Sequence, residues 1–183
     1  AEKEKAYHIW GKTFEREELH EFWLPKASII KDNTVKDVVI DYEKYSHRPP
    51  LSHQKESIQK LVENKKFILA DDMGLGKTTS TIIAALETGA KKILIVCPAT
   101  LKINWKREIE NYTDRSIFIA ESKSFSTEHD FVIINYDIIK NFHSTKDKKN
   151  SDMLNANFDL VIVDEAHYIK NAQAKRTKLI NDI

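Results

Sequence analysis

Short runs of consecutive apolar residues recur along the sequence, and they constrain the fold more than any other feature. The runs are 67–70, 93–96, 117–120, 131–134 and 160–163. Apolar residues on successive positions, rather than on alternate ones, are typical of strands that are buried on both faces. Strands of this kind form parallel sheets covered by helices, so the runs predict a three-layer α/β domain.

Helical patterns separate the apolar runs. One helix is expected to begin at Ser52, a residue that can cap it, and a second to run from Lys77 to a stop at Gly89. A third is expected to be capped by Thr100. Their apolar stripes are Ile58, Leu61 and Val62, then Ile82, Ile83 and Leu86, then Leu101, Trp105 and Ile109. This alternation of strand and helix indicates a mainly parallel sheet.

Two parts of the chain depart from this pattern. Residues 1–48 carry no phosphate-binding or catalytic pattern, and we expect a small N-terminal module there, of unknown role, with one strand at Val35–Tyr42. Pro49 and Pro50 separate it from the α/β lobe, residues 49–183. Within the lobe, the polar segment between Phe142 and Asn157 is interpreted as a mobile surface insertion.

Charge and composition exclude several classes of protein. With 29 basic and 28 acidic residues, the chain cannot hold a nucleic acid by bulk charge, so any such contact requires a local patch. No apolar run approaches the ~20 residues of a membrane-spanning helix. The single cysteine, Cys97, is expected to serve packing, and no zinc-ligand spacing is present. We therefore expect an intracellular protein of the cytoplasm, nucleoid or nucleus, neither secreted nor membrane-bound.

The loop between the run 67–70 and the following helix is typical of a phosphate-binding loop. Its glycines let backbone N–H groups close around phosphate oxygens, and the helix N-terminus adds free donors. Lys77 supplies a positive charge and Thr78 a hydroxyl for Mg²⁺. The strict pattern G-x-x-x-x-G-K-[ST] fails at its first glycine, where the chain has Asp71. The residues expected to bind the nucleotide here are Asp72, Met73, Gly74, Leu75, Gly76, Lys77, Thr78 and Thr79.

An acidic pair follows the last apolar run. Asp164 is expected to hold Mg²⁺ through water, and Glu165 to orient and polarise the attacking water. An apolar run before Asp-Glu is common by itself, but here it follows the phosphate-binding loop by several strand–helix units. Both motifs would then lie at the carboxyl edge of one sheet, with Lys77, Asp164 and Glu165 as catalytic residues and ATP and Mg²⁺ as ligands.

Four stretches together resemble the SNF2 family of helicase-like ATPases in helicase superfamily 2. They are ILADDMGLGKT (68–78), IVCPATLKINWKREI (95–109), VIINYDII (132–139) and VIVDEAHYIKN (161–171). The resemblance covers residues 51–171 and implies a RecA-like P-loop lobe. Asp72 stands where the family usually has Glu, which is similar to the annealing-helicase branch and to many prokaryotic members.

The resemblance also implies roles for single residues. Gln54 would read the adenine edge, and His167 would link the nucleotide site to the next motif. The residues that would contact nucleic acid are Thr100, Lys102, Asn135 and Tyr136. Trp105, by its spacing with apolar partners, is interpreted as a core residue rather than a base-stacking platform.

By the same resemblance, the chain is the first lobe of a DNA-dependent ATPase that moves along double-stranded DNA. The partner would be a second RecA-like lobe with arginine fingers. The lobe here would be incomplete after the acidic pair, so we expect residues 1–183 alone to bind nucleotide weakly and to be nearly inactive, since such arginines contribute ~10³–10⁵ in rate. Two alternatives stay open: a strand-separating DNA or RNA helicase, and a non-catalytic nucleotide-sensing scaffold.

Overall fold

The computed structural model describes residues 7–9, 12–14, 38–64, 68–69, 74–143, 151–171 and 173–183. The chain divides into two compact units, a first unit of residues 1–80 and a second unit of residues 81–183. Helix α3 (Lys77–Glu87) contains the boundary between the two. The predicted division at residue 48 is a different boundary and stays a prediction.

The first unit contains a short hairpin and a helix. Strands β1 (Tyr7–Ile9) and β2 (Lys12–Phe14) pair in antiparallel fashion. A 3₁₀ turn, η1 (Tyr42–Tyr45), precedes helix α2 (Ser52–Glu63). The helix begins where predicted, but Leu51 rather than Ser52 is its capping residue.

Two strands predicted in the first unit are absent from its described residues. Residues 38–41 form no strand, and Val39 is 92% exposed. Asp41 instead accepts the Glu43 backbone N–H and caps η1. Ile68 and Leu69, the described part of the predicted strand 67–70, also lie outside any strand. Both predictions relied on apolar residues alone, but a strand also needs a neighbour for its backbone N–H and C=O groups.

The second unit contains a four-stranded parallel sheet, as predicted. Its strand order is β4 (Ile117–Ile119), β5 (Phe131–Asn135), β3 (Ile93–Cys97) and β6 (Leu160–Val163). Every neighbouring pair is parallel. All residues of the central strands β3 and β5 are buried, whereas those of β4 and β6 are half-buried. Four of the five apolar runs, all except 67–70, therefore correspond to the strands of this sheet.

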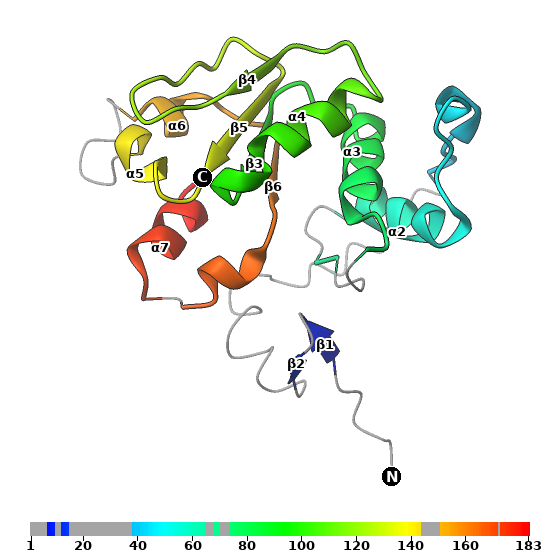
Figure 1. The fold of residues 1–183 in the computed structure, drawn as a ribbon, viewed down its shortest axis with the longest axis horizontal. Helices are drawn as coiled ribbons and strands as arrows, with labels where there is room; N and C mark the ends of the chain where they lie inside the picture. The colour runs from blue at the N-terminus through cyan, green and yellow to red at the C-terminus, as the bar shows by residue number, and fades with distance from the viewer. Residues whose placement is uncertain are drawn as a thin grey trace. The chain divides into compact units, whose positions relative to one another are not determined.

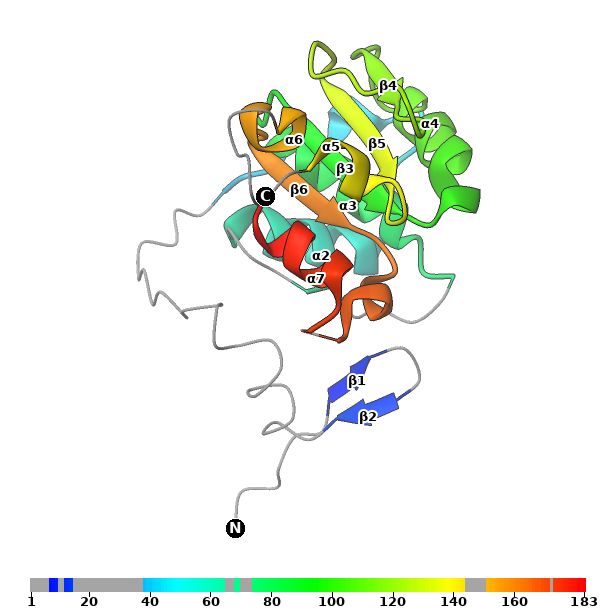
Figure 2. The ribbon, with the colours of Figure 1, turned by 90° about the vertical axis from the view of Figure 1, so that its left-hand side faces the viewer.

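Helices cover both faces of this sheet. The 3₁₀ turn η2 (Ala99–Leu101) and helix α4 (Lys102–Glu110) connect β3 to β4, while α5 (Ile139–Phe142) and α6 (Asp152–Asn155) connect β5 to β6. These crossovers run in opposite directions across the sheet, and right-handed connections then lie on opposite faces. Figure 1 shows α4 on one side of the strands and α5 and α6 on the other, and Figure 2 shows the strands in a row with α5 in front of them.

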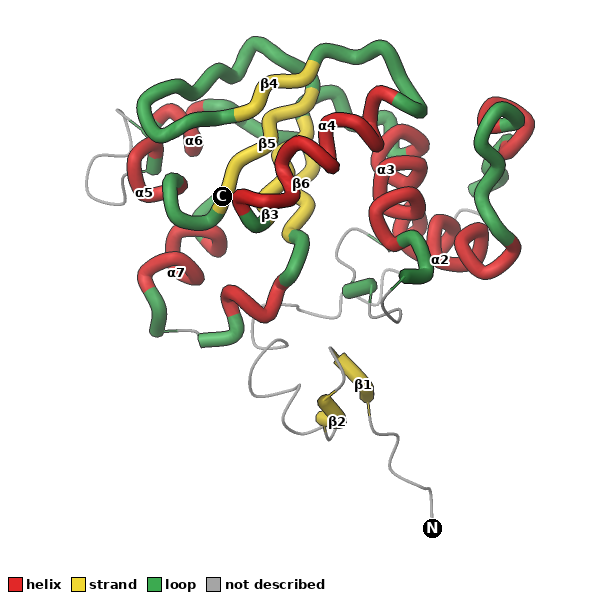
Figure 3. Tube along the Cα trace, viewed as in Figure 1, coloured by secondary structure: helices red, strands yellow, loops and turns green. Residues whose placement is uncertain are grey.

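The chain after β6 completes the second unit. It forms the 3₁₀ turn η4 (Ala166–Ile169) and helix α7 (Lys175–Asn181), which packs near α5. Figure 3 shows how strands and helices alternate through this unit. The α/β class is therefore confirmed. Among the described helices, none is long and apolar enough to cross a membrane.

The expected surface insertion 142–157 is partly wrong. Residues 144–150 lie outside the described residues, but 151–156 contain α6, where Met153 is 1% exposed and Ala156 is 3% exposed. Two apolar side chains in a polar segment were enough to hold a short helix against the core. The lysine-rich composition of the segment led to its interpretation as a surface insertion, although it contains these two apolar residues.

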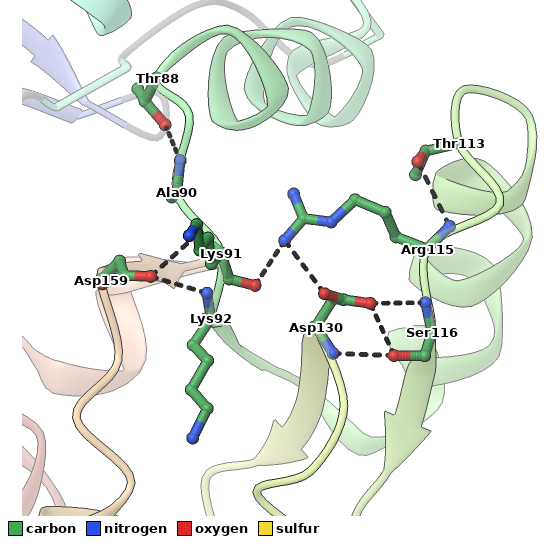
Figure 4. Close-up of polar contacts among 9 residues, drawn as sticks. All are labelled: Thr88, Ala90, Lys91, Lys92, Thr113, Arg115, Ser116, Asp130 and Asp159. Atoms are coloured by element: carbon green, nitrogen blue, oxygen red, sulfur yellow. Dashed lines mark hydrogen bonds and ion pairs between the residues drawn. The ribbon is translucent and has the colours of Figure 1, made fainter.

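Carboxylates fasten the amino edge of the sheet (Figure 4). Asp159, just before β6, accepts the backbone N–H groups of Lys91 and Lys92 at 2.9 and 2.8 Å. Asp130, just before β5, accepts the Ser116 hydroxyl and backbone N–H at 2.7 and 2.9 Å. These bonds join the starts of neighbouring strands, so the acidic residues at this edge have a structural role. The acidic pair Asp164 and Glu165 lies at the opposite, carboxyl edge of the sheet.

Candidate functional site

The glycine loop opens helix α3 in the first unit. Gly74 and Gly76 have φ angles of +85° and +73°, in the left-handed region that favours glycine. Lys77 is the first residue of α3, and Thr78 and Thr79 complete its first turn. Such a loop presents backbone N–H groups and a helix N-terminus to an anion. The predicted ligands Asp72 and Met73 lie outside the described residues.

Gln54 of α2 is attached to this loop. Its side chain is only 7% exposed, so it does not face solvent as a surface glutamine would. The Leu51 backbone N–H donates to Gln54 Oε1 at 2.8 Å, and Gln54 Nε2 donates to the Leu75 carbonyl at 3.1 Å. Both ends of the amide therefore connect the start of α2 with the glycine loop. Its adenine-reading role stays a prediction.

Gln54 lies so close to the loop at position 76 that a side chain there would displace its amide. A Cβ added to Gly76 would lie 2.2 Å from Gln54 Nε2. At Gly74 the same addition would meet nothing within 4 Å. From the sequence, phosphate binding was the reason given for both glycines. That Gly76 also leaves room for Gln54 could not be predicted.

In the second unit, Asp164 is held at the carboxyl end of β6. Its backbone N–H donates to the Val96 carbonyl of β3 at 2.8 Å, and its carbonyl accepts the Tyr136 hydroxyl. Its carboxylate Oδ1 accepts the Glu165 backbone N–H at 2.9 Å, and Oδ2 accepts the Trp105 indole N–H at 2.8 Å. The backbone of Asp164 is thus held by β3 and by Tyr136, which follows β5, while its carboxylate is held by α4 and by the next residue, Glu165.

Glu165 occupies an unusual backbone conformation. Its φ and ψ angles are 54° and 48°, the left-handed region, which is uncommon for a residue other than glycine. Such conformations cost of order 1–3 kcal/mol and cluster at functional sites. Glu165 Oε2 also lies 3.1 Å from Nδ1 of His167, two residues further on in η4. His167 thus lies beside the carboxylate of Glu165.

Aromatic side chains support this turn. The rings of His167 and Tyr168 have centroids 4.5 Å apart, and Tyr168 stacks on Tyr136 at 5.2 Å with an interplanar angle of 13°. Burial, followed by the charge of Asp164, raises the pKa of Tyr136, so its hydroxyl stays a proton donor to the Asp164 carbonyl. The same two causes raise the pKa of Cys97 to about 12, and this thiol at the end of β3 is fully buried, as the packing interpretation predicted.

The residues predicted to contact nucleic acid lie in different environments. Thr100 is exposed within η2 and does not cap α4, because the capping residue is Leu101. Lys102 donates to the Ala120 carbonyl at 2.9 Å. Asn135 and Tyr136 are 6% and 4% exposed, so their side chains would have to become exposed to contact a nucleic acid directly. Contact at these four positions stays a prediction.

The carboxylate oxygens of Asp164 are suitable ligands for magnesium. From the described part of the chain, each Asp164 oxygen accepts one hydrogen bond, and a carboxylate offers about four lone-pair sites, so acceptor capacity remains for a cation. Within the described residues, no group of three or more His, Cys, Asp or Glu side chains could hold a metal ion. Mg²⁺ does not need such a group, because it commonly takes one or two protein oxygens with substrate phosphates and water.

A parallel sheet covered by helices, a glycine loop that opens a helix and an acidic pair after a strand together define an α/β lobe of the helicase-like class. The profile of the SNF2-related domain family matches residues 53–183, and the chain belongs to this family.

Relatives of the chain include bacterial and eukaryotic proteins. An uncharacterized ATP-dependent helicase of Bacillus subtilis, YqhH, is 36% identical over 73% of this chain and 24% of its own length. The human DNA repair and recombination protein RAD54B is 35% identical over 77% of the chain and 18% of its own length. A Caenorhabditis elegans homologue of SWI/SNF-related matrix-associated actin-dependent regulator of chromatin subfamily A-like protein 1 is 29% identical over 87% and 22%. The chain spans less than a quarter of these relatives.

Proposed function

We propose that the chain is the ATP-binding lobe of an SNF2-type, DNA-dependent ATPase that moves along double-stranded DNA. Membership of the SNF2-related domain family supports ATP-driven chemistry. The name of one relative, a DNA repair and recombination protein, supports DNA as the partner. The observation that carries the proposal is the acidic pair after β6, where Asp164 is fixed on both oxygens and Glu165 follows in a left-handed turn.

Each residue of the two motifs has a distinct role in this proposal. Lys77 and the N-terminus of α3 bind the phosphates. Thr78 and Asp164 would hold Mg²⁺, which when bound neutralises charge on the phosphate oxygens. Glu165 orients the attacking water, and the contact with His167 fixes the direction of its carboxylate.

The nucleic acid and the second lobe are also part of the proposal. Thr100, which is exposed in η2 just before α4, would contact a phosphate of one DNA strand. A second RecA-like lobe would supply the arginine side chains that this lobe needs for turnover. A protein of this kind acts where DNA is, in the nucleoid or the nucleus.

The test is the ATPase activity of the intact protein that contains this chain, measured with and without duplex DNA. Lys77→Ala should abolish ATP binding. Glu165→Gln should retain ATP binding and lose about 10²–10⁴-fold in turnover, because only water activation is removed. Glu128→Gln, an exposed glutamate far along the chain from both motifs, is the matched control and should not change the rate.

Two results would contradict the proposal. Turnover by Glu165→Gln at the rate of the control would exclude water activation by Glu165. A Lys77→Ala protein that keeps its cellular function would instead favour the nucleotide-sensing scaffold.

A strand-separating helicase is the second candidate, favoured by the name of the Bacillus subtilis relative, an ATP-dependent helicase. Stimulation of ATPase activity by duplex DNA, single-stranded DNA and RNA distinguishes the candidates. A translocase should respond most strongly to duplex DNA and should not displace an annealed strand. Release of a labelled strand, with stimulation by single strands, would establish the helicase instead.

A further inference from the structure

Trp105 does more than fill the core between α4 and the sheet. Its side chain is 3% exposed, and its indole Nε1–H donates to Asp164 Oδ2 at 2.8 Å, across 59 positions of sequence. A phenylalanine or leucine would satisfy an apolar position on α4 without any donor. A buried indole requires an acceptor for its N–H, and here that acceptor is a charged carboxylate.

The hydrogen bonds of Asp164 show what this donor can control. The backbone of Asp164 is fixed by Val96 and Tyr136, so the position of its Cα does not depend on Trp105. Among the described residues, two donors set the rotation of the carboxylate about its own bond, the Glu165 N–H on Oδ1 and the Trp105 N–H on Oδ2. The Glu165 N–H belongs to the next residue, so it moves together with Asp164 if the turn changes. Trp105 belongs to a separate helix and holds the carboxylate independently of the turn.

We propose that Trp105 is a positioning residue for magnesium: its indole N–H fixes the carboxylate of Asp164 so that the remaining lone pairs point toward the cation. This inference rests on the proposed function, since it takes Asp164 as a magnesium ligand. Donors that orient a ligating carboxylate typically contribute 10–100-fold to metal affinity or activity. Loss of the Trp105 donor should therefore weaken the response to Mg²⁺ by about 10–100-fold and leave metal-free nucleotide binding unchanged.

The first test is a titration of Mg²⁺ into the 183-residue chain with a fluorescent ATP analogue. Trp105→Phe keeps an aromatic ring and removes the donor. Ile109→Val, one turn further along the same face of α4 and fully buried, is the matched control for packing. Trp105→Phe should raise the half-saturating Mg²⁺ concentration about 10–100-fold, and Ile109→Val should leave it unchanged. Asp164→Ala should remove the Mg²⁺ dependence altogether.

A second measurement does not depend on the folding of any variant. In the unaltered, ¹⁵N-labelled chain, the Trp105 indole N–H resonance, assigned through its own ring correlations, should lie downfield of free indole. It should shift when Mg²⁺ is added to the ATP complex, and ATP without Mg²⁺ should shift it much less.

The outcomes separate this inference from the proposed function. If Asp164→Ala abolishes the Mg²⁺ dependence while Trp105→Phe matches Ile109→Val, the positioning role is overturned and the proposed function stands. If Asp164→Ala itself has no effect on the Mg²⁺ dependence, the magnesium site fails and both are overturned. An indole resonance at the position of free indole, unmoved by Mg²⁺, would also overturn the positioning role.

Discussion

Replacing Gly76 by alanine should destabilise the glycine loop more than the same replacement at Gly74. Both glycines have positive φ, so each substitution carries the left-handed cost of roughly 1–2 kcal/mol. Only at Gly76 does the new Cβ meet another group, since it would lie 2.2 Å from Gln54 Nε2. The two glycines therefore form a matched pair that differs in one contact.

The size of the difference follows from the hydrogen bonds of Gln54. To relieve the clash the amide must move, and it then loses its bonds to the Leu51 N–H at 2.8 Å and to the Leu75 carbonyl at 3.1 Å. A net contribution of about 0.5–1.5 kcal/mol for each bond gives an extra loss of about 1–3 kcal/mol for Gly76→Ala. Its total cost is then about 2–5 kcal/mol, against about 1–2 kcal/mol for Gly74→Ala.

Urea unfolding of four variants measures this coupling. They are Gly74→Ala, Gly76→Ala, Gln54→Ala and the double variant Gly76→Ala/Gln54→Ala. Because Gln54→Ala removes the clashing amide, the double variant should cost about 1–3 kcal/mol less than the sum of the two single variants. Equal losses for Gly74→Ala and Gly76→Ala, with additive costs in the double variant, would refute the argument.

Three further predictions concern the second unit. Cys97, with its pKa raised to about 12, should be neutral in the folded chain at pH 8.5 and react with iodoacetamide about 10³-fold more slowly than in urea; equal rates would contradict this. Hydrogen bonds from Ser116 lower the pKa of Asp130 in the folded chain. The ionised Asp130 carboxylate therefore stabilises the fold fully above its pKa in the unfolded chain, about 3.9, and this stabilisation is lost as the pH falls through the lower pKa of the folded chain. The difference in unfolding free energy between the wild type and Asp130→Asn should accordingly disappear below that pH, and a difference that persists would exclude the effect. Ile95→Ala, in the centre of β3, should lose about 2–5 kcal/mol in urea unfolding, whereas Ile103→Ala, 51% exposed on α4, should change stability by only about 0.5 kcal/mol; similar losses for both would contradict the assigned core.

The sheet of the second unit could be predicted because each of its strands is marked by a short run of apolar residues in the sequence. The run 160–163 matches β6 in both bounds, and the runs 93–96 and 131–134 miss only the last residue of β3 and β5. Runs of this kind reveal a strand when neighbours bury it on both faces. They fail at 38–41 and 68–69, where the described residues provide no pairing strand and the apolar side chains alone do not form one.

The candidate site was only partly predictable for a related reason. Asp164 and Glu165 follow a strand, so their position could be predicted from sequence order. The hydrogen bond from Trp105 could not, because its spacing along α4 matches that of a core residue, and only the folded structure brings it to Asp164. The left-handed turn at Glu165 was equally hidden, since no glycine marks it.

We propose that one nucleotide, with its magnesium, binds both to the glycine loop of the first unit and to the acidic pair of the second. In the most direct measurement, Mn²⁺ and ATP are added to the ¹⁵N-labelled chain and the paramagnetic broadening of its backbone amide resonances is recorded. This broadening detects even weak binding. The account predicts that the amides of Gly76 and Lys77 broaden together with those of Asp164 and Glu165, and only when ATP is present. Broadening at one of these two places without the other would contradict it.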